Sequence, residues 1–310
     1  MKSGKKLSLV IPVYFNSGSL PHLFKALLEI KGFLAAKKMG LELVFVDDGS
    51  GDDSLAQLLA FKAGKPYVKV IKHTRNFGAP RAAKTGLRFV TGDAFIISAA
   101  DLQDPPTLIP QMVELWLNGS KFVLCARSSR DDPWSSVIFS KAYYFLLRLL
   151  VLPQFPANGY DMALMDAVML PYLLQSSKSS YVPLLAYWLG YRPEIIYYHR
   201  PARAHGRSMW TFTKKVHLFL DVMLGFSINP IRIISGLGAL ISCLSVSYGI
   251  FIVCNGLLHK IPVPGFASLA ALISFLLGLV ILMLGVIGEY LWRIFEELNR
   301  RPESVVEKIY

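Results

Sequence analysis

The sequence predicts a doubly wound α/β domain followed by two membrane-spanning helices. Over the first hundred residues, short apolar runs alternate with helical periodicity, and each run ends in polar residues. Two much longer runs without acidic or basic residues follow nearer the C-terminus. The composition agrees with this division. An apolar fraction of 53% and a mean hydropathy of +0.43 are too high for an ordinary soluble domain, and 17% charged residues is too many for a chain buried entirely in lipid.

The first strands are expected at residues 7–13 and 41–46, which are continuous runs rich in Leu, Val and Ile. Between them, residues 20–38 repeat leucine at helical spacing. A second helix around residues 55–59 and two further strands, at 67–72 and 94–97, continue the alternation. Strands and helices that alternate in this way indicate a parallel sheet covered by helices.

A polar cluster follows each expected strand. The clusters are Asn16, Asp47 with Asp48, Arg75 with Asn76, and Asp101 with Gln103 and Asp104. Ligands of such sheets bind beyond the carboxyl ends of the strands, so the clusters predict one binding site. A lone Asp-Asp-Gly is more often a simple turn than part of a site. Four polar clusters at four strand ends are harder to explain as four unrelated turns.

The phosphate-binding loops of other α/β proteins are missing. No G-x-G-x-x-G follows the first strand and no G-x-x-x-x-G-K-[ST] occurs, which disfavours a dehydrogenase or a P-loop NTPase. The three cysteines show neither a disulfide framework nor zinc-site spacing. Carboxylates, carboxamides and arginines remain, and they suit a divalent metal that bridges a carboxylate to a diphosphate.

Residues 233–258 and 263–288 contain no acidic or basic side chain, and each run exceeds the roughly 20 residues that cross a bilayer. A buried helical hairpin in a soluble core is the alternative. Cationic residues flank the outer ends of the pair, whereas the link offers only Lys260. The positive-inside rule therefore places both termini in the cytoplasm of a multi-pass protein of the cytoplasmic membrane. Glycines in both runs allow close helix contact, within the hairpin or in a homo-oligomer.

Before the first span, residues 210–226 mix aromatic and aliphatic residues with Lys214 and Lys215 at helical spacing. We expect an amphipathic helix on the bilayer surface, although packing against the soluble domain explains the same periodicity. The predicted organisation is a cytoplasmic domain at 1–209, an interfacial helix at 210–230, a transmembrane hairpin at 231–292 and a cytoplasmic tail at 293–310. The net charge of +12 then points to membrane lipid and phosphate ligands, and no nucleic-acid partner is expected.

Four motifs lie at the predicted strand ends: I-P-V-Y at 11–14, V-D-D-G-S at 46–50, R-N-F-G at 75–78 and D-L-Q-D-P-P at 101–106. With them, nearly the whole chain resembles the polyprenyl-phosphate glycosyltransferases of glycosyltransferase family 2, the group that includes dolichyl-phosphate mannose synthase and bactoprenol glucosyltransferases. D-L-Q-D-P-P is specific in this setting, whereas V-D-D-G-S alone marks the wider family.

The resemblance implies a GT-A fold and inverting transfer of a sugar from a nucleoside-diphosphate donor, first of all a UDP-sugar. The implied acceptor is undecaprenyl or another polyprenyl phosphate at the cytoplasmic membrane face, for cell-envelope glycan synthesis or modification. The implied cofactor is Mg²⁺ or Mn²⁺.

The resemblance also assigns roles to single residues. The residues that fall where the family holds the nucleotide are Pro12, Tyr14, Asn16, Asp47, Asp48, Arg75 and Asn76. Asp101 and Gln103 match the residues that bind the metal and the diphosphate in the family, and the resemblance also implies a catalytic role for Asp101. The basic residues expected at phosphate groups are Arg127, Arg130, Arg203 and Arg207, for which ordinary surface charge is the alternative.

Asp161 matches the carboxylate usually proposed as the catalytic base. A polyprenyl phosphate has a second pKa of about 6 and is already an anion near neutral pH. We therefore expect Asp161 to position the acceptor or to stabilise charge on the sugar ring. The alternative is an N-cap for a helix over residues 162–170.

The sequence departs from the family pattern at three places. Ala99 replaces the first aspartate of the usual D-x-D, Phe15 is inserted before Asn16, and A-P-R at 79–81 replaces the common H-Q-A. Ala99 motivates one alternative, a membrane scaffold with weakened catalysis. The other alternative is a processive polysaccharide synthase. Such an enzyme needs more membrane spans and a Q-x-x-R-W motif, to which R-S-M-W at 207–210 is only weakly similar.

Overall fold

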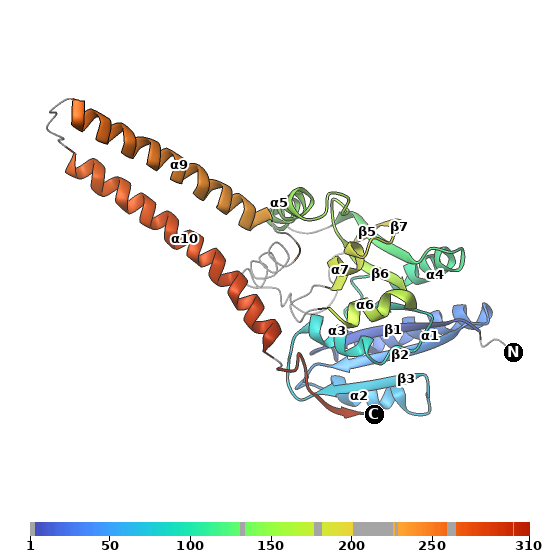
Figure 1. The fold of residues 1–310 in the computed structure, drawn as a ribbon. Coiled ribbons are helices and arrows are strands. Elements are labelled where there is room, and N and C mark those ends of the chain that lie inside the picture. The colour runs from blue at the N-terminus through green and yellow to red at the C-terminus, as the bar shows by residue number, and fades with distance from the viewer. Residues whose placement is uncertain are drawn as a thin grey trace. The chain divides into compact units, whose positions relative to one another are not determined.

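The computed structural model describes residues 4–130, 134–176, 182–200, 226, 229–258, 265–299 and 301–310. The chain divides into two compact units, drawn with their elements in Figure 1. Unit 1 comprises Met1–Val222 together with Arg301–Tyr310, and unit 2 comprises Met223–Arg300. The chain therefore leaves unit 1 and returns to it after unit 2.

Unit 1 is built on a sheet that has eight strands in the described part of the chain, in the order β7-β5-β6-β4-β1-β2-β3-β8. The strands are β1 (Lys6–Val13), β2 (Gly40–Asp47), β3 (Val68–His73), β4 (Ala94–Ile97), β5 (Phe122–Arg130), β6 (Tyr160–Asp166), β7 (Glu194–Arg200) and β8 (Val306–Ile309). The first four pair in parallel, at the positions that the sequence predicts to within one residue at each end. The sheet as a whole is mixed, because β6 runs antiparallel to β4 and β5, and β8 runs antiparallel to β3.

The helices of unit 1 cover both faces of this sheet. They are α1 (Leu20–Ala36), α2 (Ser54–Lys62), α3 (Ala79–Leu87), α4 (Ile109–Leu117), α5 (Trp134–Leu150), α6 (Leu170–Leu174) and α7 (Val182–Trp188). Helix α1 buries leucines at helical spacing, and these pack with Leu7, Leu9 and Ile11 of β1 in one core. Helix α3 approaches the opposite face. A Cβ added at its Gly86 would lie 3.1 Å from the side chain of Val46, so the glycine lets the helix come close to the strands.

The last residues of the chain complete the sheet. Strand β8 pairs with β3, with Ile309 opposite Ile71, and Figure 1 shows the dark red C-terminal arrow beside β3. The backbone N–H of Thr74 donates to the carbonyl of Val305 at 3.1 Å, and that of Tyr310 donates to the carbonyl of Val70 at 2.8 Å. The sequence was predicted to end in a cytoplasmic tail over residues 293–310. The structure continues a helix to Leu298 and places a strand of unit 1 at the end.

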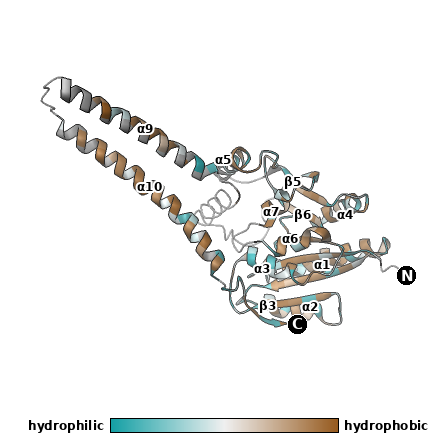
Figure 2. Cartoon of the chain, viewed as in Figure 1, coloured by the Kyte–Doolittle hydropathy of each residue, from teal (hydrophilic) through white to brown (hydrophobic). Residues whose placement is uncertain are grey.

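Unit 2 contains the helices α9 (Asn229–Leu258) and α10 (Phe266–Leu298). In the described part of the chain one helix is long and apolar enough to cross a membrane, through the window Phe275–Trp292 of α10, whose mean hydropathy is 2.1. Figure 2 shows the brown, apolar colouring along this helix. The second predicted span overlaps that window. Helix α9 coincides with the first predicted span, and its crossing of a membrane stays a prediction.

One of the glycines noted in the sequence contributes to packing between the two helices of unit 2. A Cβ added at Gly238 of α9 would lie 2.9 Å from the side chain of Met283 of α10. This glycine therefore serves the hairpin. The interfacial helix expected before the hairpin lies almost entirely outside the described residues, which resume at 226 and 229.

Candidate active site

The predicted site residues gather along one edge of the sheet of unit 1. Val13 at the end of β1 pairs with Asp47 at the end of β2, and Asp47 pairs with Lys72 near the end of β3. Strand β6 is antiparallel to both β4 and β5, so β5 ends at the same edge as β4 and β6 begins there. Asp161, the second residue of β6, therefore lies at the edge where the other strands end.

Asp47 is fully buried at this edge. The backbone N–H of Ser50 donates to its Oδ1 at 3.3 Å, whereas its Oδ2 has no hydrogen-bond partner among the described residues. Burial raises the pKa of this carboxyl above its ordinary value. A buried acceptor without a hydrogen-bond partner is costly, and the N–H of a ligand would satisfy it.

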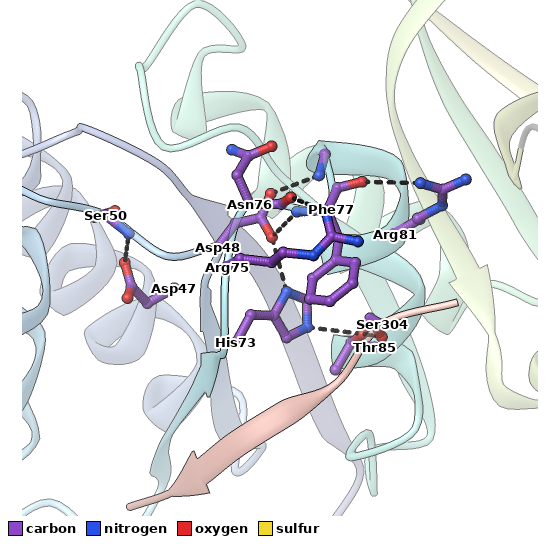
Figure 3. Close-up of polar contacts among 11 residues, drawn as sticks. Asp47, Asp48, Ser50, His73, Arg75, Asn76, Phe77, Arg81, Thr85 and Ser304 are labelled. Carbon is purple, nitrogen blue, oxygen red and sulfur yellow. Dashed lines mark hydrogen bonds and ion pairs between the residues drawn. The ribbon is translucent and has the colours of Figure 1, made fainter. Parts of the chain in front are cut away.

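Asp48 has both carboxylate oxygens occupied by the protein itself, as Figure 3 shows. Oδ1 accepts from the backbone N–H of Phe77 at 2.9 Å and lies 2.8 Å from Nδ1 of the buried His73. Oδ2 accepts from the backbone N–H of Gly78 at 2.8 Å. Asp48 thus holds the loop that carries R-N-F-G, and direct contact of its carboxylate with a nucleotide stays a prediction.

The R-N-F-G loop lies close against the V-D-D-G-S turn. Gly49 has φ +74°, and a Cβ added to it would lie 2.7 Å from the backbone carbon of Arg75. Only glycine combines this backbone conformation with so close an approach. The loop exposes Arg75 and Asn76, and the guanidinium of Arg75 stacks over the ring of Phe77 at 4.3 Å. Both predicted nucleotide-binding side chains of this loop therefore face outward.

The turn after β1 accommodates the inserted Phe15 in a left-handed backbone conformation, with φ 53°. Its ring is exposed and packs edge-on against Tyr14 at 4.7 Å. The side chain of Asn16 accepts from the backbone N–H of Tyr14 at 2.9 Å, so this predicted ligand residue shapes its own turn. Pro12 lies within β1, opposite Val46 of β2.

The D-L-Q-D-P-P segment follows β4 at the same edge. The backbone N–H of Gln103 donates to Oδ1 of Asp101 at 3.2 Å, and Leu102 between them has φ 58°. Ala99 is exposed. Within the described ranges no three His, Cys, Asp or Glu side chains are grouped to hold a metal. Asp101 nevertheless offers one hard oxygen ligand, and Mg²⁺ commonly uses one or two carboxylates together with phosphate oxygens and water.

Asp161 and Arg127, predicted separately, form an ion pair. Nε of Arg127 donates to Oδ2 of Asp161 at 2.5 Å, and a terminal nitrogen of the guanidinium donates to Oδ1. The hydroxyl of Tyr198 donates to Oδ2 at 2.6 Å. Burial alone would lower the pKa of Arg127, but the hydrogen bonds and charge of Asp161 raise it. Asp161 lies in a strand, so its interpretation as a helix N-cap is wrong.

The thiol of Cys125 connects this ion pair with the D-L-Q-D-P-P segment. Its pKa is raised to about 12, first by burial and then by the negative charges of Asp104 and Asp161. Both carboxylates therefore lie near the same buried side chain of β5. The thiol stays protonated near neutral pH, which excludes it as a nucleophile.

Some site residues were missed by the sequence prediction, and some predicted ones are not placed. His73 and Tyr198 contribute directly to the two clusters, but each reads in the sequence as an ordinary strand residue. Arg130 ends β5, and Arg203 and Arg207 lie outside the described residues. Their contact with phosphate stays a prediction.

Comparison with known proteins agrees with this geometry. The sequence profile of glycosyl transferase family 2 matches residues 8–170, more than half of the chain. The chain is 35% identical to a glycosyltransferase of Synechocystis over 98% of this chain and 96% of that protein. It is 32% identical to a prophage-derived bactoprenol glucosyl transferase of Shigella flexneri over 98% of each chain. A prophage bactoprenol glucosyl transferase homologue of Escherichia coli is 30% identical over 98% of this chain and 99% of that one.

The fold also matches solved structures. Glucosyl-3-phosphoglycerate synthase of Mycobacterium tuberculosis superposes with a TM-score of 0.52 over 73% of this chain and 82% of that one, at 16% identity. A crystal structure of that synthase with Mn²⁺, uridine diphosphate and phosphoglyceric acid gives a TM-score of 0.51 over 72% of this chain and 77% of that one, at 17% identity.

The mixed sheet, with its polar edge beyond the first strands, is thus a GT-A-like glycosyltransferase fold. The chain belongs to glycosyl transferase family 2 and is a sugar-transferring enzyme.

Proposed function

We propose that the protein transfers a sugar from a nucleoside-diphosphate donor, first of all a UDP-sugar, to undecaprenyl or another polyprenyl phosphate at the cytoplasmic membrane face, with inversion. One observation carries this proposal. The chain aligns from end to end with proteins named for glucosyl transfer to bactoprenol, at 30–32% identity. Glucose is therefore the first sugar to test, and cell-envelope glycan synthesis or modification is the expected use of the product.

The donor would bind at the ends of β1, β2 and β3. The unpaired buried oxygen of Asp47 would accept from an N–H of the base, and a ring N–H of this kind is carried by uracil and by guanine. Arg75 is exposed on its loop and could pair with a diphosphate oxygen. Pro12, Tyr14, Asn16 and Asn76 lie on the segments around this position.

Asp101, with Gln103 and water, would hold Mg²⁺ or Mn²⁺. Asp101 would be the one carboxylate ligand of this ion, and phosphate oxygens of the donor would supply the remaining ligands. When bound, such an ion neutralises the negative charge that grows on the departing diphosphate.

Asp161 would act by holding Arg127 in place. Its oxygens accept from Arg127 and Tyr198, and this environment stabilises the ionised carboxylate. The acceptor phosphate needs no strong base, because it is already an anion near neutral pH. Arg127 is then held in an orientation suited to the acceptor phosphate, and the Asp161 carboxylate adds negative charge near the reacting sugar.

A membrane hairpin made of both α9 and α10 is supported by chain connectivity. Strand β8 follows α10 and pairs with β3 of unit 1, so the chain must return to the side from which it left. A single crossing by α10 would put β8 on the wrong side. None of the Phe275–Trp292 window is buried, unlike the core helix of a soluble protein, and its apolar surface requires a lipid or protein partner.

The test is sugar transfer by membranes that contain the full-length protein. Labelled UDP- and GDP-sugars would be supplied with undecaprenyl phosphate and Mg²⁺ or Mn²⁺, and the lipid extract would be analysed. We expect one labelled glycolipid from one donor, lost in chelator and in Asp101→Asn. A labelled polymer in place of the glycolipid would favour a processive synthase. No product with folded protein and every donor would favour an inactive scaffold.

A further inference from the structure

We propose that Ser304, in the C-terminal segment of the chain, is a positioning residue for the R-N-F-G loop of the donor site. Ser304 would act through Thr85 and His73 on Asp48, which holds that loop. The inference rests on the proposed function in one respect, namely that the R-N-F-G loop contacts the nucleotide donor.

The contacts form one continuous series, drawn in Figure 3. Oγ of Ser304 lies 2.7 Å from Oγ1 of Thr85, and Oγ1 of Thr85 lies 3.0 Å from Nε2 of His73. Nδ1 of His73 lies 2.8 Å from Oδ1 of Asp48. All four side chains are buried, with Ser304 the most exposed at 9%. The series therefore runs through the interior, away from competing water.

The chemistry of the four groups gives the series a direction. Nδ1 of His73 faces a carboxylate, which only accepts, so this nitrogen carries the hydrogen. In the neutral ring, Nε2 then accepts from the hydroxyl of Thr85, and Thr85 accepts in turn from Ser304. Each hydroxyl fixes the next group in a single orientation. Removing the Ser304 hydroxyl removes the donor to Oγ1 of Thr85. The Thr85 hydroxyl is then less firmly oriented toward His73, whose ring supports Asp48.

The segment around Ser304 is held firmly enough to serve as the fixed end of this series. Glu303 pairs with Nζ of Lys84 at 2.8 Å, and the two side chains are only 11% and 5% exposed. Strand β8 begins two residues after Ser304, and the backbone N–H of Thr74 donates to the carbonyl of Val305. Breaking a nearly buried ion pair is strongly unfavourable, so the segment has few alternative positions.

Ser304 comes from a different part of the chain than the three residues that it supports. Ser304 lies four residues after the end of unit 2, whereas Asp48, His73 and Thr85 all precede that unit. The donor loop is therefore supported in full only after the chain has returned from unit 2. The sheet order shows the same dependence, because β8 borders β3, whose last residue is His73.

The test uses full-length Ser304→Ala, Ser304→Thr and Glu307→Ala. Glu307 lies on β8 but pairs with Lys72 near the surface, so its variant is a control for general loosening of the strand. For Ser304→Ala we expect KM for the donor to rise ~fivefold, as for the loss of about one net hydrogen bond, with KM for the acceptor unchanged. Ser304→Thr keeps a hydroxyl at this position and should have a donor KM close to the wild-type value. Glu307→Ala should also leave the donor KM at the wild-type value.

A double variant tests whether Ser304 acts through Thr85. In Thr85→Val the hydroxyl is removed with little change in shape, and adding Ser304→Ala should raise the donor KM no further. A lower Tm for Ser304→Ala with an unchanged donor KM would show a merely structural role and overturn the inference. Additive effects of the two substitutions would also overturn it.

The two proposals can fail separately. If the wild-type protein transfers no sugar to lipid but binds uridine diphosphate, the proposed function fails, and the affinities for uridine diphosphate then test the inference. Equal affinities of the wild-type protein and Ser304→Ala would overturn it. A wild-type protein that neither transfers sugar nor binds the nucleotide would overturn both.

Discussion

At the scale of one residue, Asp47 is where we expect stability and donor binding to oppose each other. Because burial raises its pKa, the carboxyl costs stability as the pH rises above the ordinary carboxyl range and the group must ionise. Asp47→Asn removes that charge. We expect its Tm to equal or exceed the wild-type Tm at pH 7, while the affinity for uridine diphosphate falls about tenfold or more, because an N–H of the base loses a charged acceptor.

Thermal unfolding and calorimetric titration measure these two effects separately. Ser50→Ala is the comparison variant, because it removes the hydroxyl that contacts Asp47 and the N–H of Phe15 but leaves the carboxyl group of Asp47 in place. Unchanged nucleotide affinity in Asp47→Asn would show that the buried oxygen does not face the ligand.

Asp161 allows a second prediction at this scale. Asp161→Asn keeps the shape of the side chain but removes the charge that pairs with Arg127. We expect kcat to fall roughly tenfold to a hundredfold with little change in KM for the donor, because a charged, buried contact is lost beside the proposed acceptor site. The variant should keep the wild-type shape of kcat against pH between pH 5.5 and 8.5. We expect that shape to follow ionisation of the proposed acceptor phosphate, near a pKa of about 6.

A general base would behave differently. In that case the acidic limb of the wild-type profile would belong to Asp161 and would disappear in Asp161→Asn. Tyr198→Phe serves as the matched variant, since it removes a neutral hydrogen bond to the same carboxylate. Its effect on kcat should be the smaller of the two.

At the scale of elements, the loop after β2 depends on Gly49. Gly49→Ala should lower stability by about 1–3 kcal/mol for the positive φ alone, and it should also displace the R-N-F-G loop. Gly64→Ala is the control, because Gly64 has φ +69° but a Cβ there meets nothing within 4 Å in the described structure. Both variants should lose stability in denaturant unfolding. Only Gly49→Ala should also lose nucleotide affinity, and equal affinities would contradict a role for the close approach.

A buried network nearer the amino ends of β1 and β2 predicts acid sensitivity. Burial would raise the pKa of Glu42, but hydrogen bonds from Ser8, Thr91 and Lys69 together lower it to about 2. A lowered pKa contributes stability that is complete above the ordinary value near 4.5 and is lost as the pH falls toward 2. Glu42→Gln should therefore be less stable than the wild-type protein by roughly 1–3 kcal/mol at pH 7, with a smaller difference below pH about 4.

Denaturant unfolding at several pH values measures that difference. If the stability difference between the wild-type protein and Glu42→Gln were the same at low and neutral pH, ionisation of Glu42 would not contribute to stability. Lys69→Met removes one donor of the network, a partly exposed one, and should cost less than Glu42→Gln.

The elements also show which parts of the fold a sequence can predict. Strands β1 to β4 are short, apolar and separated by periodic helices, so their positions and their common edge follow from pattern alone. Strand β8 has four residues, of which three are exposed, and its pairing with β3 depends on contacts more than 200 residues apart in sequence. No local pattern predicts such a strand. For the same reason the predicted roles of Asp48 and Asp161 lacked their partners His73 and Tyr198, which pack beside them only in the folded sheet.

At the scale of the whole molecule, the return of the chain to unit 1 constrains how unit 2 can cross a membrane. Residues on both sides of unit 2 belong to one sheet, so the number of crossings must be even. Two crossings, by α9 and α10, are the smallest number for a protein that spans the membrane. The link at residues 259–264 would then lie on the far side, and β8 on the cytoplasmic side with the donor site. An oligomer built through the helix glycines stays a prediction.

Single cysteines in an otherwise cysteine-free full-length protein test this topology. Ile261→Cys lies in the link, and Glu307→Cys lies on β8, where the native side chain is about half exposed. With intact cells and an impermeant maleimide, we expect Ile261→Cys to be labelled and Glu307→Cys to be labelled only after permeabilisation. Labelling of Glu307→Cys in intact cells would contradict a cytoplasmic position of β8 and of the sheet with which it pairs. Protection of Ile261→Cys in intact cells, with labelling after permeabilisation, would mean that the hairpin does not cross, and the apolar face of α10 would then need a protein partner in place of lipid.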